Sequence, residues 1–386
     1  MLARHIDDVV LAIATFPFIY YLITLYSSWR FFRQKVKAPP VSPAFTPPVS
    51  NLKPIRGLDP DAYENFASLC RQNYPQYELL FCVSNNDDPA VPVLEQLARD
   101  FPERTIRIIV GSGRTGPNDK VAKLARLTEE AQYETLVIND SDVRVEPDYF
   151  RTIVAPLRDP NVGAVTCLYA SAETEGETFA EKIHSVGMIS DFFPSIICAR
   201  QLDGVKFALG TTIATTRAQL AAFGGYDAIV NRPADDLLIG RLIADQGKQV
   251  ELLPYSVLTV SDYGSLYELL QKRLRWIVVM RYMRPGGHFG LIFTFGLPWC
   301  LIAIAVHPAL AVAAVFLGIY MLLRLAMTLF VGAAGLRQRR LWAKLPLVVV
   351  WDALAFFLWL ISFTRSSIRW RDGKYRIRGG QLVPVP

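Results

Sequence analysis

The sequence predicts an α/β domain with a mostly parallel sheet, flanked by apolar segments that are long enough to cross a membrane. Short β-branched runs alternate with helical patterns through the middle of the chain, which is typical of a parallel sheet with helices on both faces. The 386 residues are 52% hydrophobic. The apolar excess collects near the N-terminus and after residue 288, so a soluble middle between membrane pieces is expected.

The N-terminal apolar run, residues 9–26, is just long enough to cross the hydrocarbon core as a helix. A cleaved signal peptide is less favoured, because no small-residue cleavage site follows the run. Basic residues gather on its C-terminal side, at Arg30, Arg33, Lys35 and Lys37. The positive-inside rule therefore predicts that the middle of the chain is cytoplasmic.

The middle of the chain carries the strand and helix signals. Buried strands are predicted over Glu78–Val83, Ile106–Val110, Thr135–Ile138 and Val162–Tyr169. Helices are predicted to begin at Asp59-Pro60, with Asp59 as N-cap, and to cover Ala90–Asp100, Lys120–Gln132 and Pro147–Leu157. In such sheets ligands bind beyond the carboxyl ends of the strands.

The C-terminal part is helical and largely apolar. Residues 265–283 predict a helix with leucines near one face and Lys272, Arg273, Arg275 and Arg281 on a basic side, which suits either a membrane surface or a half-buried position. Three membrane-length stretches follow, at 289–306, 309–330 and 345–363. The predicted order is a transmembrane anchor (1–30), a proline-rich linker (31–48), the α/β domain (49–264), an amphipathic interfacial helix (265–288), membrane segments (289–364) and a basic tail (365–386).

Composition excludes several other classes of protein. The five cysteines have no metal-ligand spacing and are expected to be free buried thiols, and the four histidines are dispersed. The net charge of +6 comes largely from residues beside apolar segments. We therefore expect lipid headgroups as partners rather than nucleic acid.

Two carboxylates directly follow a predicted strand, at Asp140 and Asp142. Such a pair in a loop can converge on Mg²⁺ or Mn²⁺, which bind diphosphate oxygens on their other side. The alternative is a pair of solvated turn residues. Their position at the carboxyl end of a strand favours the metal site.

Three further polar motifs each have a structural alternative. Asp88 can accept hydrogen bonds from a nucleobase or ribose, although spacing alone favours a helix N-cap with Pro89 at the first position. Asp235 and Asp236 begin a helical stretch and suit a general base or ordinary partners of the helix dipole. Arg275 and Trp276 suit a diphosphate clamp or an interfacial anchor.

The order of these motifs resembles the family-2-like glycosyltransferases with the GT-A fold, and more closely the ceramide glucosyltransferases, the family-21-like group. The resemblance covers nearly the whole chain. It includes Lys53-Pro54-Ile55-Arg56-Gly57, Gln72-Asn73-Tyr74-Pro75, Asp87-Asp88-Pro89-Ala90 and the tail blocks Ile368-Arg369-Trp370-Arg371 and Gly373-Lys374-Tyr375-Arg376. The bacterial hopanoid glycosyltransferases are also similar.

The resemblance implies a role for each matched residue. Lys53, Asp88, Asp140 and Asp142 would bind the nucleotide-sugar donor, with a divalent metal, Mg²⁺ or Mn²⁺, on Asp140 and Asp142. Asp236 would be the general base. Asp235, Lys272, Arg275 and Trp276 would hold the diphosphate and the acceptor. The implied reaction is inverting transfer of a hexose, chiefly glucose from UDP-glucose, to a lipid hydroxyl such as that of ceramide.

Two departures bear on these roles. Lys272 stands where the family has Gln or Arg, and lysine lacks the planar fork of arginine. The animal ceramide enzymes lack an acid at the position of Asp142, so a hopanoid acceptor with UDP-N-acetylglucosamine stays an alternative. A processive polysaccharide synthase would need more membrane segments than the sequence offers. A non-catalytic membrane scaffold is an alternative from another class, but it would have no need for all of the acidic residues named above.

Ionisable residues also occur within the apolar C-terminal segments. Arg324 and Asp352 flank the basic loop 337–344, which predicts an ion pair across an antiparallel helical hairpin. The positive-inside rule places both the basic loop and the basic tail in the cytoplasm. A full membrane span between them would instead place them on opposite sides. This conflict suggests that residues 345–363 form a re-entrant or interfacial hairpin.

Overall fold

The computed structural model describes residues 2–34, 45–113, 117–173, 176–260, 263–370 and 373–385. It divides into two compact units, each assembled from separate stretches of the chain. One, the sheet unit, comprises 35–172 and 204–262, and the other, the helical unit, comprises 1–34, 173–203 and 263–386. The two units are described separately below.

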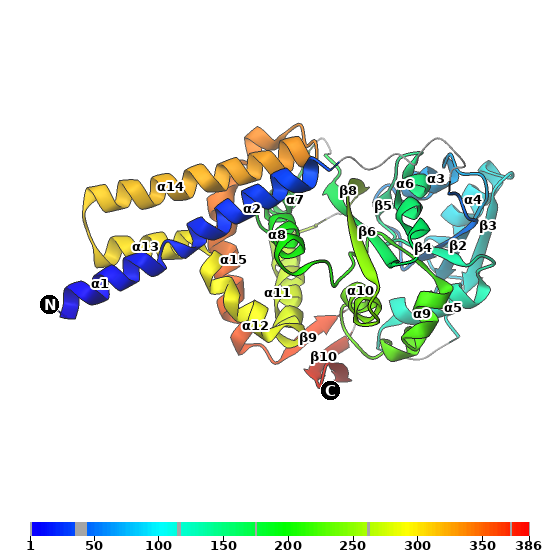
Figure 1. Cartoon of the computed structure of the whole chain (residues 1–386). Coiled ribbons are helices and arrows are strands. Elements are labelled where there is room, and N and C mark those ends of the chain that lie inside the picture. Colours follow the sequence, from blue (N-terminus) through cyan, green and yellow to red (C-terminus); the bar gives the residue numbers. More distant parts are fainter. Residues whose placement is uncertain are drawn as a thin grey trace. The chain divides into compact units, whose positions relative to one another are not determined.

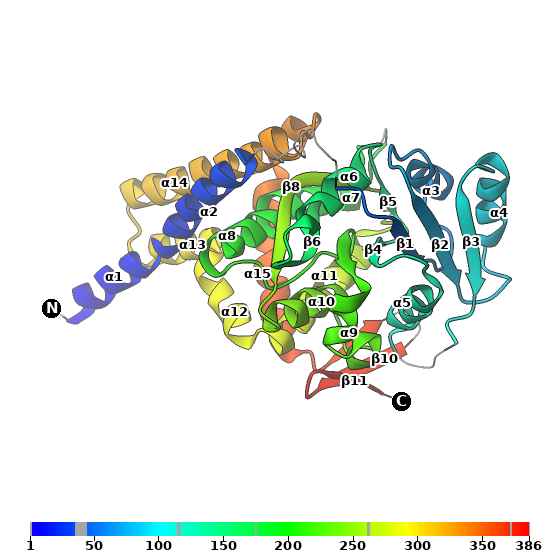
Figure 2. The ribbon, with the colours of Figure 1, turned by 45° about the vertical axis from the view of Figure 1, so that its right-hand side comes forward.

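The sheet unit is built on eight strands in the order β3-β2-β1-β4-β7-β6-β8-β5 (Figures 1 and 2). The strands are β1 Val49–Pro54, β2 Tyr77–Val83, β3 Thr105–Val110, β4 Thr135–Ile138, β5 Val143–Arg144, β6 Val162–Ser171, β7 Ile213–Thr216 and β8 Gln249–Thr259. Neighbours from β3 to β4 are parallel, as are β6 and β8, whereas β7 and β5 run antiparallel. The predicted α/β fold with a mostly parallel sheet is confirmed.

Helices cover both faces of this sheet, and its central strands β1, β2 and β4 are accordingly buried on both sides. They are α3 Ala62–Cys70, α4 Val91–Asp100, α5 Asp119–Glu130, α6 Tyr149–Val154, α9 Arg217–Ala222 and α10 Asp235–Asp245, with short turns η1 Ala155–Arg158 and η3 Gly225–Ala228. Phe66, Leu94 and Phe150 bring α3, α4 and α6 into one core with Leu79 and Phe81 of β2. α5 packs against β1 and β2 from the other face.

The four predicted strands are confirmed as β2, β3, β4 and β6, whereas the two predicted N-caps, Asp59 and Asp88, are wrong. α3 begins at Ala62 after Asp61, which has a left-handed backbone (φ 54°) and no capping side-chain bond. α4 begins at Val91 with Ala90 as its cap residue. In both places the Asp-Pro pair lies before the helix rather than at its first turn.

The helical unit consists of helices with a small C-terminal sheet. Its helices are α1 Leu2–Ile13, α2 Phe16–Phe32, α7 Phe179–Gly187, α8 Phe193–Asp203, α11 Leu266–Met283, α12 Pro285–Gly290, α13 Gly296–Val306, α14 Leu310–Leu329 and α15 Leu347–Thr364. Shorter turns are η2 Met188–Phe192, η4 Leu291–Thr294, η5 Phe330–Gly335 and η6 Leu341–Lys344. The strands β9 Ser367–Trp370, β10 Gly373–Arg378 and β11 Gln381–Pro384 pair antiparallel.

Among the described residues, three helical stretches are long and apolar enough to cross a membrane, namely Ile6–Phe32, Leu310–Gly335 and Leu347–Thr364. The predicted stretch 289–306 is not one straight helix: α12 and η4 are bent by 54° from α13 at Phe295. The five cysteines are free and buried, as predicted. Residues 35–44 of the predicted linker and Arg371 of the tail lie outside the described residues.

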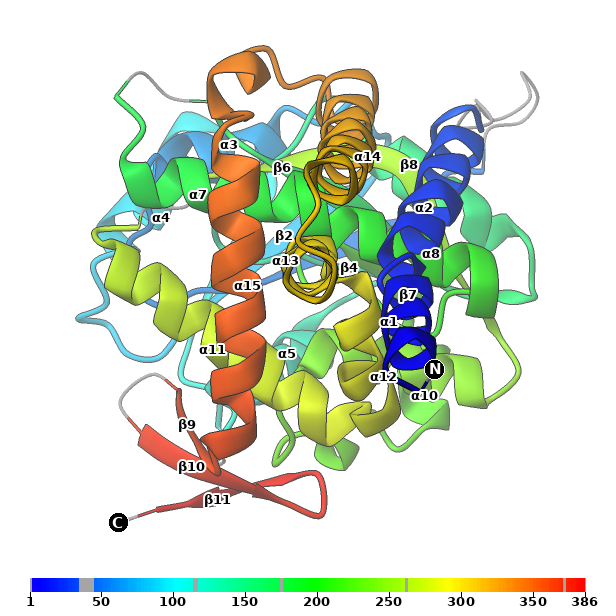
Figure 3. The same ribbon diagram turned by 90° about the vertical axis from the view of Figure 1, so that its left-hand side faces the viewer.

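The predicted pair of Arg324 and Asp352 is confirmed. Arg324 Nε donates to Asp352 Oδ2 at 2.8 Å, a second guanidinium nitrogen bonds Oδ1, and Tyr320 Oη donates to Oδ2 at 2.7 Å. The predicted antiparallel hairpin is wrong, because α15 crosses α14 instead of running back along it (Figures 1 and 3).

Candidate active site in the sheet unit

The Asp140–Asp142 loop follows β4 and rests on a buried lysine of the neighbouring strand. Lys53 is fully buried, and its Nζ donates to the main-chain oxygens of Asp140 (2.8 Å) and Val143 (3.5 Å). Burial lowers the pKa of Lys53 to about 8, against the opposing effect of the charges of Asp142 and Asp140. Lys53 therefore holds the loop from below, and its predicted contact with a donor stays a prediction.

A buried polar network fixes the start of the same loop. Asn139 Nδ2 donates to Tyr149 Oη and to the carbonyl of Thr211, both at 2.7 Å. Asn51 Nδ2 donates to Asn139 Oδ1 at 2.7 Å. These bonds tie β1, β4, α6 and the segment before β7 together, because buried amides must find partners.

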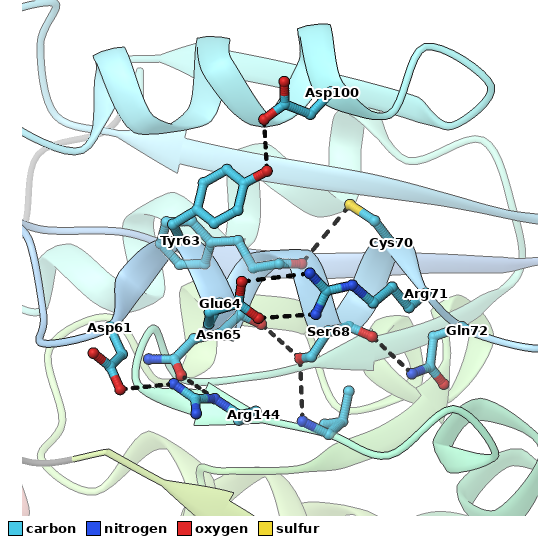
Figure 4. A network of polar contacts seen from close by, with 12 residues as sticks. Asp61, Tyr63, Glu64, Asn65, Ser68, Cys70, Arg71, Gln72, Asp100 and Arg144 are labelled. Atoms are coloured by element: carbon cyan, nitrogen blue, oxygen red, sulfur yellow. Dashed lines mark hydrogen bonds and ion pairs between the residues drawn. The ribbon is translucent and has the colours of Figure 1, made fainter.

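The far end of the loop is tied to α3 (Figure 4). Arg144 Nε donates to Asn65 Oδ1 and its Nη2 to Asp61 Oδ2, both at 3.0 Å, while Val145 N donates to Ser68 Oγ at 3.1 Å. The loop is thus held at both ends, which preorganises the two carboxylates between them.

Lys120 joins the Asp140 loop to the start of α10. Its Nζ lies 2.7 Å from Asp140 Oδ1 and 3.0 Å from Asp235 Oδ2. Burial would lower the pKa of Lys120, but Asp140, Asp235 and Asp236 raise it by more, so the ammonium stays charged. One cation therefore bridges carboxylates that are almost 100 residues apart in the sequence.

Asp236 is held by two main-chain donors. Gly210 N donates to Oδ2 at 3.0 Å, and Leu237 N donates to Oδ1 at 2.8 Å. Burial raises the pKa of Asp236 to about 6; the charge of Asp235 adds to this rise, and Lys120 opposes it. A carboxylate with such a pKa is ionised at neutral pH and remains a useful base.

Two backbone features position the start of α10. Ala234 has a left-handed backbone (φ 58°), a strained conformation for alanine, directly before Asp235. Gly240 packs so closely that a Cβ there would lie 2.2 Å from the carbonyl carbon of Phe207. Gly210 is also confined, by side chains of the cluster, since a Cβ would lie 2.9 Å from Asp140 Oδ2 and 3.3 Å from Lys120 Nζ.

Asp88 links the loops that follow β1 and β2. Its Oδ2 accepts from Gly57 N at 3.1 Å and its Oδ1 from Ala90 N at 3.0 Å. Gly57 has a positive φ of 70°, which favours glycine. Asp88 is therefore a loop clamp rather than the predicted N-cap, and its contact with a nucleoside stays a prediction.

Lys272, Arg275 and Trp276 belong to α11 of the helical unit. Lys272 Nζ donates to Tyr263 Oη at 3.0 Å, and the Trp276 ring lies 5.8 Å from that of Phe192. The predicted basic side of this helix is wrong in one position, because Arg273 is buried.

Arg273 Nη2 lies 3.1 Å from His184 Nδ1, and its guanidinium lies over Trp276 and Trp351. Burial and then the charges of Arg273 and Lys272 keep the pKa of His184 low, so its imidazole is neutral.

The structure thus brings Asp140, Asp235 and Asp236 together around Lys120 and Gly210, with Lys53 under the loop that carries Asp140 and Asp142. Sequence reasoning missed Lys120. A signal was present, because a lysine in the first turn of a helix opposes the helix dipole and so calls for an anionic partner. Within the described residues, no three Asp, Glu, His or Cys side chains form a metal-binding group.

Similar proteins agree with this fold. The family model described as Glycosyl transferase family 21 matches residues 9–383. Ceramide glucosyltransferase 3 of Caenorhabditis elegans is 24% identical over a 415-residue alignment covering 99% of this chain and 85% of the relative. Ceramide glucosyltransferase of Komagataella phaffii is 34% identical over 135 residues, 33% of this chain and 26% of the relative.

A solved structure shows the same fold. Mannosyltransferase PcManGT from Pyrobaculum calidifontis, in complex with GDP-Man and Mn²⁺, aligns with a TM-score of 0.61 at 18% identity and covers 92% of this chain and 98% of its own. The fold is therefore that of the GT-A glycosyltransferases. The chain belongs to glycosyl transferase family 21, and it is a membrane-associated hexosyltransferase.

Proposed function

We propose that this protein transfers glucose from UDP-glucose to the hydroxyl group of a membrane lipid, with ceramide as the leading acceptor. Two C. elegans relatives named as ceramide glucosyltransferases align with 99% of this chain and support this choice. The apolar helices support a substrate that stays in the bilayer. The basic residues after the first apolar helix support a cytoplasmic sheet unit in a multi-pass protein.

The observation that carries the proposal is the environment of Asp236. In the proposed step the lipid hydroxyl oxygen bonds to the anomeric carbon while the bond from that carbon to the diphosphate breaks. UDP leaves, and Asp236 takes the hydroxyl proton. The two main-chain bonds orient the carboxylate, and its raised pKa of about 6 suits a base. A single displacement of this kind inverts the anomeric centre.

Asp140 and Asp142 fit a divalent metal in the chemistry of their oxygen donors. Mg²⁺ is commonly held by one or two carboxylates together with substrate phosphates, so a larger protein ligand set is not required. When bound, Mg²⁺ or Mn²⁺ would offset charge on the departing diphosphate. Lys120, which already pairs with Asp140, would reduce the charge repulsion between the neighbouring carboxylates.

The remaining roles follow the family resemblance. Lys53 and Asp88 would shape the donor site, and Asp235 would hold Lys120 near it. Lys272, Arg275 and Trp276 of α11 would hold the diphosphate and acceptor.

The test is UDP release by purified protein in lipid nanodiscs. Each of UDP-glucose and UDP-N-acetylglucosamine is offered with ceramide, diacylglycerol or a hopanoid, with and without EDTA. We expect release that requires UDP-glucose and ceramide, falls with EDTA and is lost in Asp236→Asn. Asp245→Asn is the matched control, because Asp245 lies on the same helix with an exposed side chain.

Other outcomes have distinct meanings. Equal release by wild type and Asp236→Asn would exclude Asp236 as the base. Release only with UDP-N-acetylglucosamine and a hopanoid would mean that these, and not UDP-glucose and ceramide, are the donor and the acceptor. That second candidate is favoured by the complete Asp140-x-Asp142 motif.

A further inference from the structure

The long apolar helix α15 has basic segments at both ends. Before it lies the loop with Arg337, Arg339 and Arg340, and after it lies the tail with Arg365, Arg369, Lys374, Arg376 and Arg378. A helix that crossed the bilayer would place these segments on opposite sides, against the positive-inside rule. Length and composition alone do not resolve this conflict.

The direction of α15 within the helical unit does resolve it. α2 packs beside α14, and α14 beside α13. The ring of Phe32, the last residue of α2, lies 6.3 Å from that of Phe330, directly after α14. α2 and α14 therefore end on the same side. α15 crosses the direction of α14 in Figure 1, and Figure 3 looks nearly along α14 while α15 runs from top to bottom of the picture (Figures 1, 2 and 3).

A charged helix lies along one side of α15. α11 carries Glu268, Lys272, Arg273, Arg275 and Arg281 and packs against α15. The Arg273 guanidinium lies 5.0 Å from the Trp351 ring near the start of α15, and Arg281 donates to the carbonyls of Ser362 and Arg365 at its end. Contacts at both ends mean that α11 accompanies α15 over most of its length. A helix with five charged side chains would be costly inside hydrocarbon.

The other side of α15 is apolar and exposed. Val350, Phe357 and Ile361 are 40%, 58% and 41% exposed, and they fall on one helical face because they are separated by seven and four residues. Trp351 and Trp359 are buried. One face of α15 is therefore exposed and the opposite face is packed against the protein, although the sequence of the helix is apolar on all faces.

We infer that α15 does not cross the membrane but lies in the plane of one bilayer surface. Its face formed by Val350, Phe357 and Ile361 enters the boundary between headgroups and acyl chains, and α11 covers the opposite face. α2 and α14 then cross the bilayer. Trp342, 71% exposed just before α15, would anchor at the same level. Both basic segments then face the headgroups of the same leaflet, where anionic lipids attract them.

The partner surface is thus a lipid monolayer, and the inference does not depend on the sugar or acceptor. It follows from three observations: helix direction, the charged helix alongside, and the exposed apolar face.

Sidedness tests the inference directly. Single cysteines replace Arg339 in the loop, Gln381 in the tail and His307 in the turn between α13 and α14, all exposed positions. Sealed vesicles are treated with a membrane-impermeant maleimide. We expect Arg339→Cys and Gln381→Cys to react from the same side and His307→Cys from the opposite side. Wild type is the background control, because its five cysteines are buried. Reaction of the loop and tail from opposite sides would overturn the inference.

Depth provides a second, independent test. Nitroxide labels at Val350, Phe357 and Ile361 are compared by their accessibility to oxygen and to a polar nickel reagent. An in-plane helix gives three similar, shallow depths. A spanning helix would separate Val350 from Phe357 by about 10 Å in depth, since seven residues rise 1.5 Å each, and that result would also overturn the inference.

Discussion

At the scale of single residues, the site depends on how charge is shared around Lys120. Three carboxylates, Asp140, Asp235 and Asp236, influence one ammonium group. Two of them bond it directly. Asp236 instead accepts main-chain hydrogen bonds, and burial raises its pKa. The cluster therefore contains one carboxylate suited to take a proton, beside two that pair with the ammonium group.

The pKa of Asp236 predicts the acid limb of the activity profile. A base must be deprotonated to act, so kcat/KM should rise as pH increases through about 6 and level off above about 7. Asp236→Asn should reduce kcat by roughly 100- to 10,000-fold. Initial rates of UDP release between pH 5 and about 8 measure both effects. A rate that is independent of pH down to 5 would contradict the assignment.

Removal of the Lys120 charge should move that limb. Lys120 lowers the pKa of Asp236, so Lys120→Met should shift the limb to higher pH and reduce activity at neutral pH. Lys120→Arg keeps the charge and should leave the limb near its original position. A limb that stays in place in Lys120→Met, in protein with an unchanged melting temperature, would show that Lys120 does not act on Asp236.

The carboxylates of the site could be predicted from the sequence, but several of the residues that contact them could not. Asp140, Asp142, Asp235 and Asp236 were predicted because carboxylates after a strand or at a helix start are visible in a sequence. Lys120, Asn139 and Gly210 were missed, because their importance comes from contacts between distant segments. The same cause explains Asp88, which bonds Gly57 of a distant loop in addition to its local bond from Ala90 N.

At the scale of elements, α10 is positioned by close packing at Gly240. Any side chain there would collide with the main chain at Phe207 and Ala208, and main chain cannot move aside as a flexible side chain can. The same helix begins with Asp235 and Asp236. The fit of one glycine therefore determines where the two carboxylates lie.

Gly240→Ala should destabilise the protein by about 1–3 kcal/mol, the usual cost of overpacking, and should reduce activity because α10 must shift. Thermal melting and UDP release measure the two effects. Gly318→Ala in α14 is the control, since a Cβ there meets nothing within 4 Å, and its melting temperature should be unchanged or slightly higher. Equal melting temperatures for Gly240→Ala and wild type would contradict the close packing.

Element positions were well predicted where hydrophobic pattern decides them. The strand 135–138 has the same bounds in sequence and structure. Helix starts were less accurate at α3 and α4, because tertiary bonds decided them. The 289–306 stretch was predicted as one segment, but hydropathy alone does not reveal the bend at Phe295.

At the scale of the whole molecule, a buried ion pair holds separate elements of the helical unit together. The Arg324 and Asp352 side chains are 5% and 9% exposed, and Arg324 also donates to the carbonyl of Ser190. One guanidinium therefore connects α14, α15 and η2. The paired charges favour one arrangement of these three elements.

Asp352→Asn and Arg324→Leu should each destabilise the protein by roughly 3–5 kcal/mol, because each leaves a buried partner uncompensated. The double variant should lose clearly less than the sum of the single losses. Melting in detergent for all four proteins of the cycle gives the coupling. Additive losses would mean that the pair contributes no stability through its own attraction.

The division of the chain was the feature least accessible from sequence. Residues 173–203 were placed within the α/β domain, whereas by contacts they belong to the helical unit. Hydropathy gives no sign of this, because α7 and α8 have the composition of ordinary soluble helices. The predicted domain boundaries and functions remain predictions.

The chain changes unit after residues 34, 172, 203 and 262, and this has a consequence for biosynthesis. When the ribosome has finished β8, the sheet unit has all its strands, but α2, α7 and α8 still lack α11 and α13–α15. A nascent chain at that point exposes apolar surface whose partners do not yet exist. Nonsense truncations in the last third should therefore leave an unassembled helical unit, recognised by quality control, rather than a smaller working enzyme.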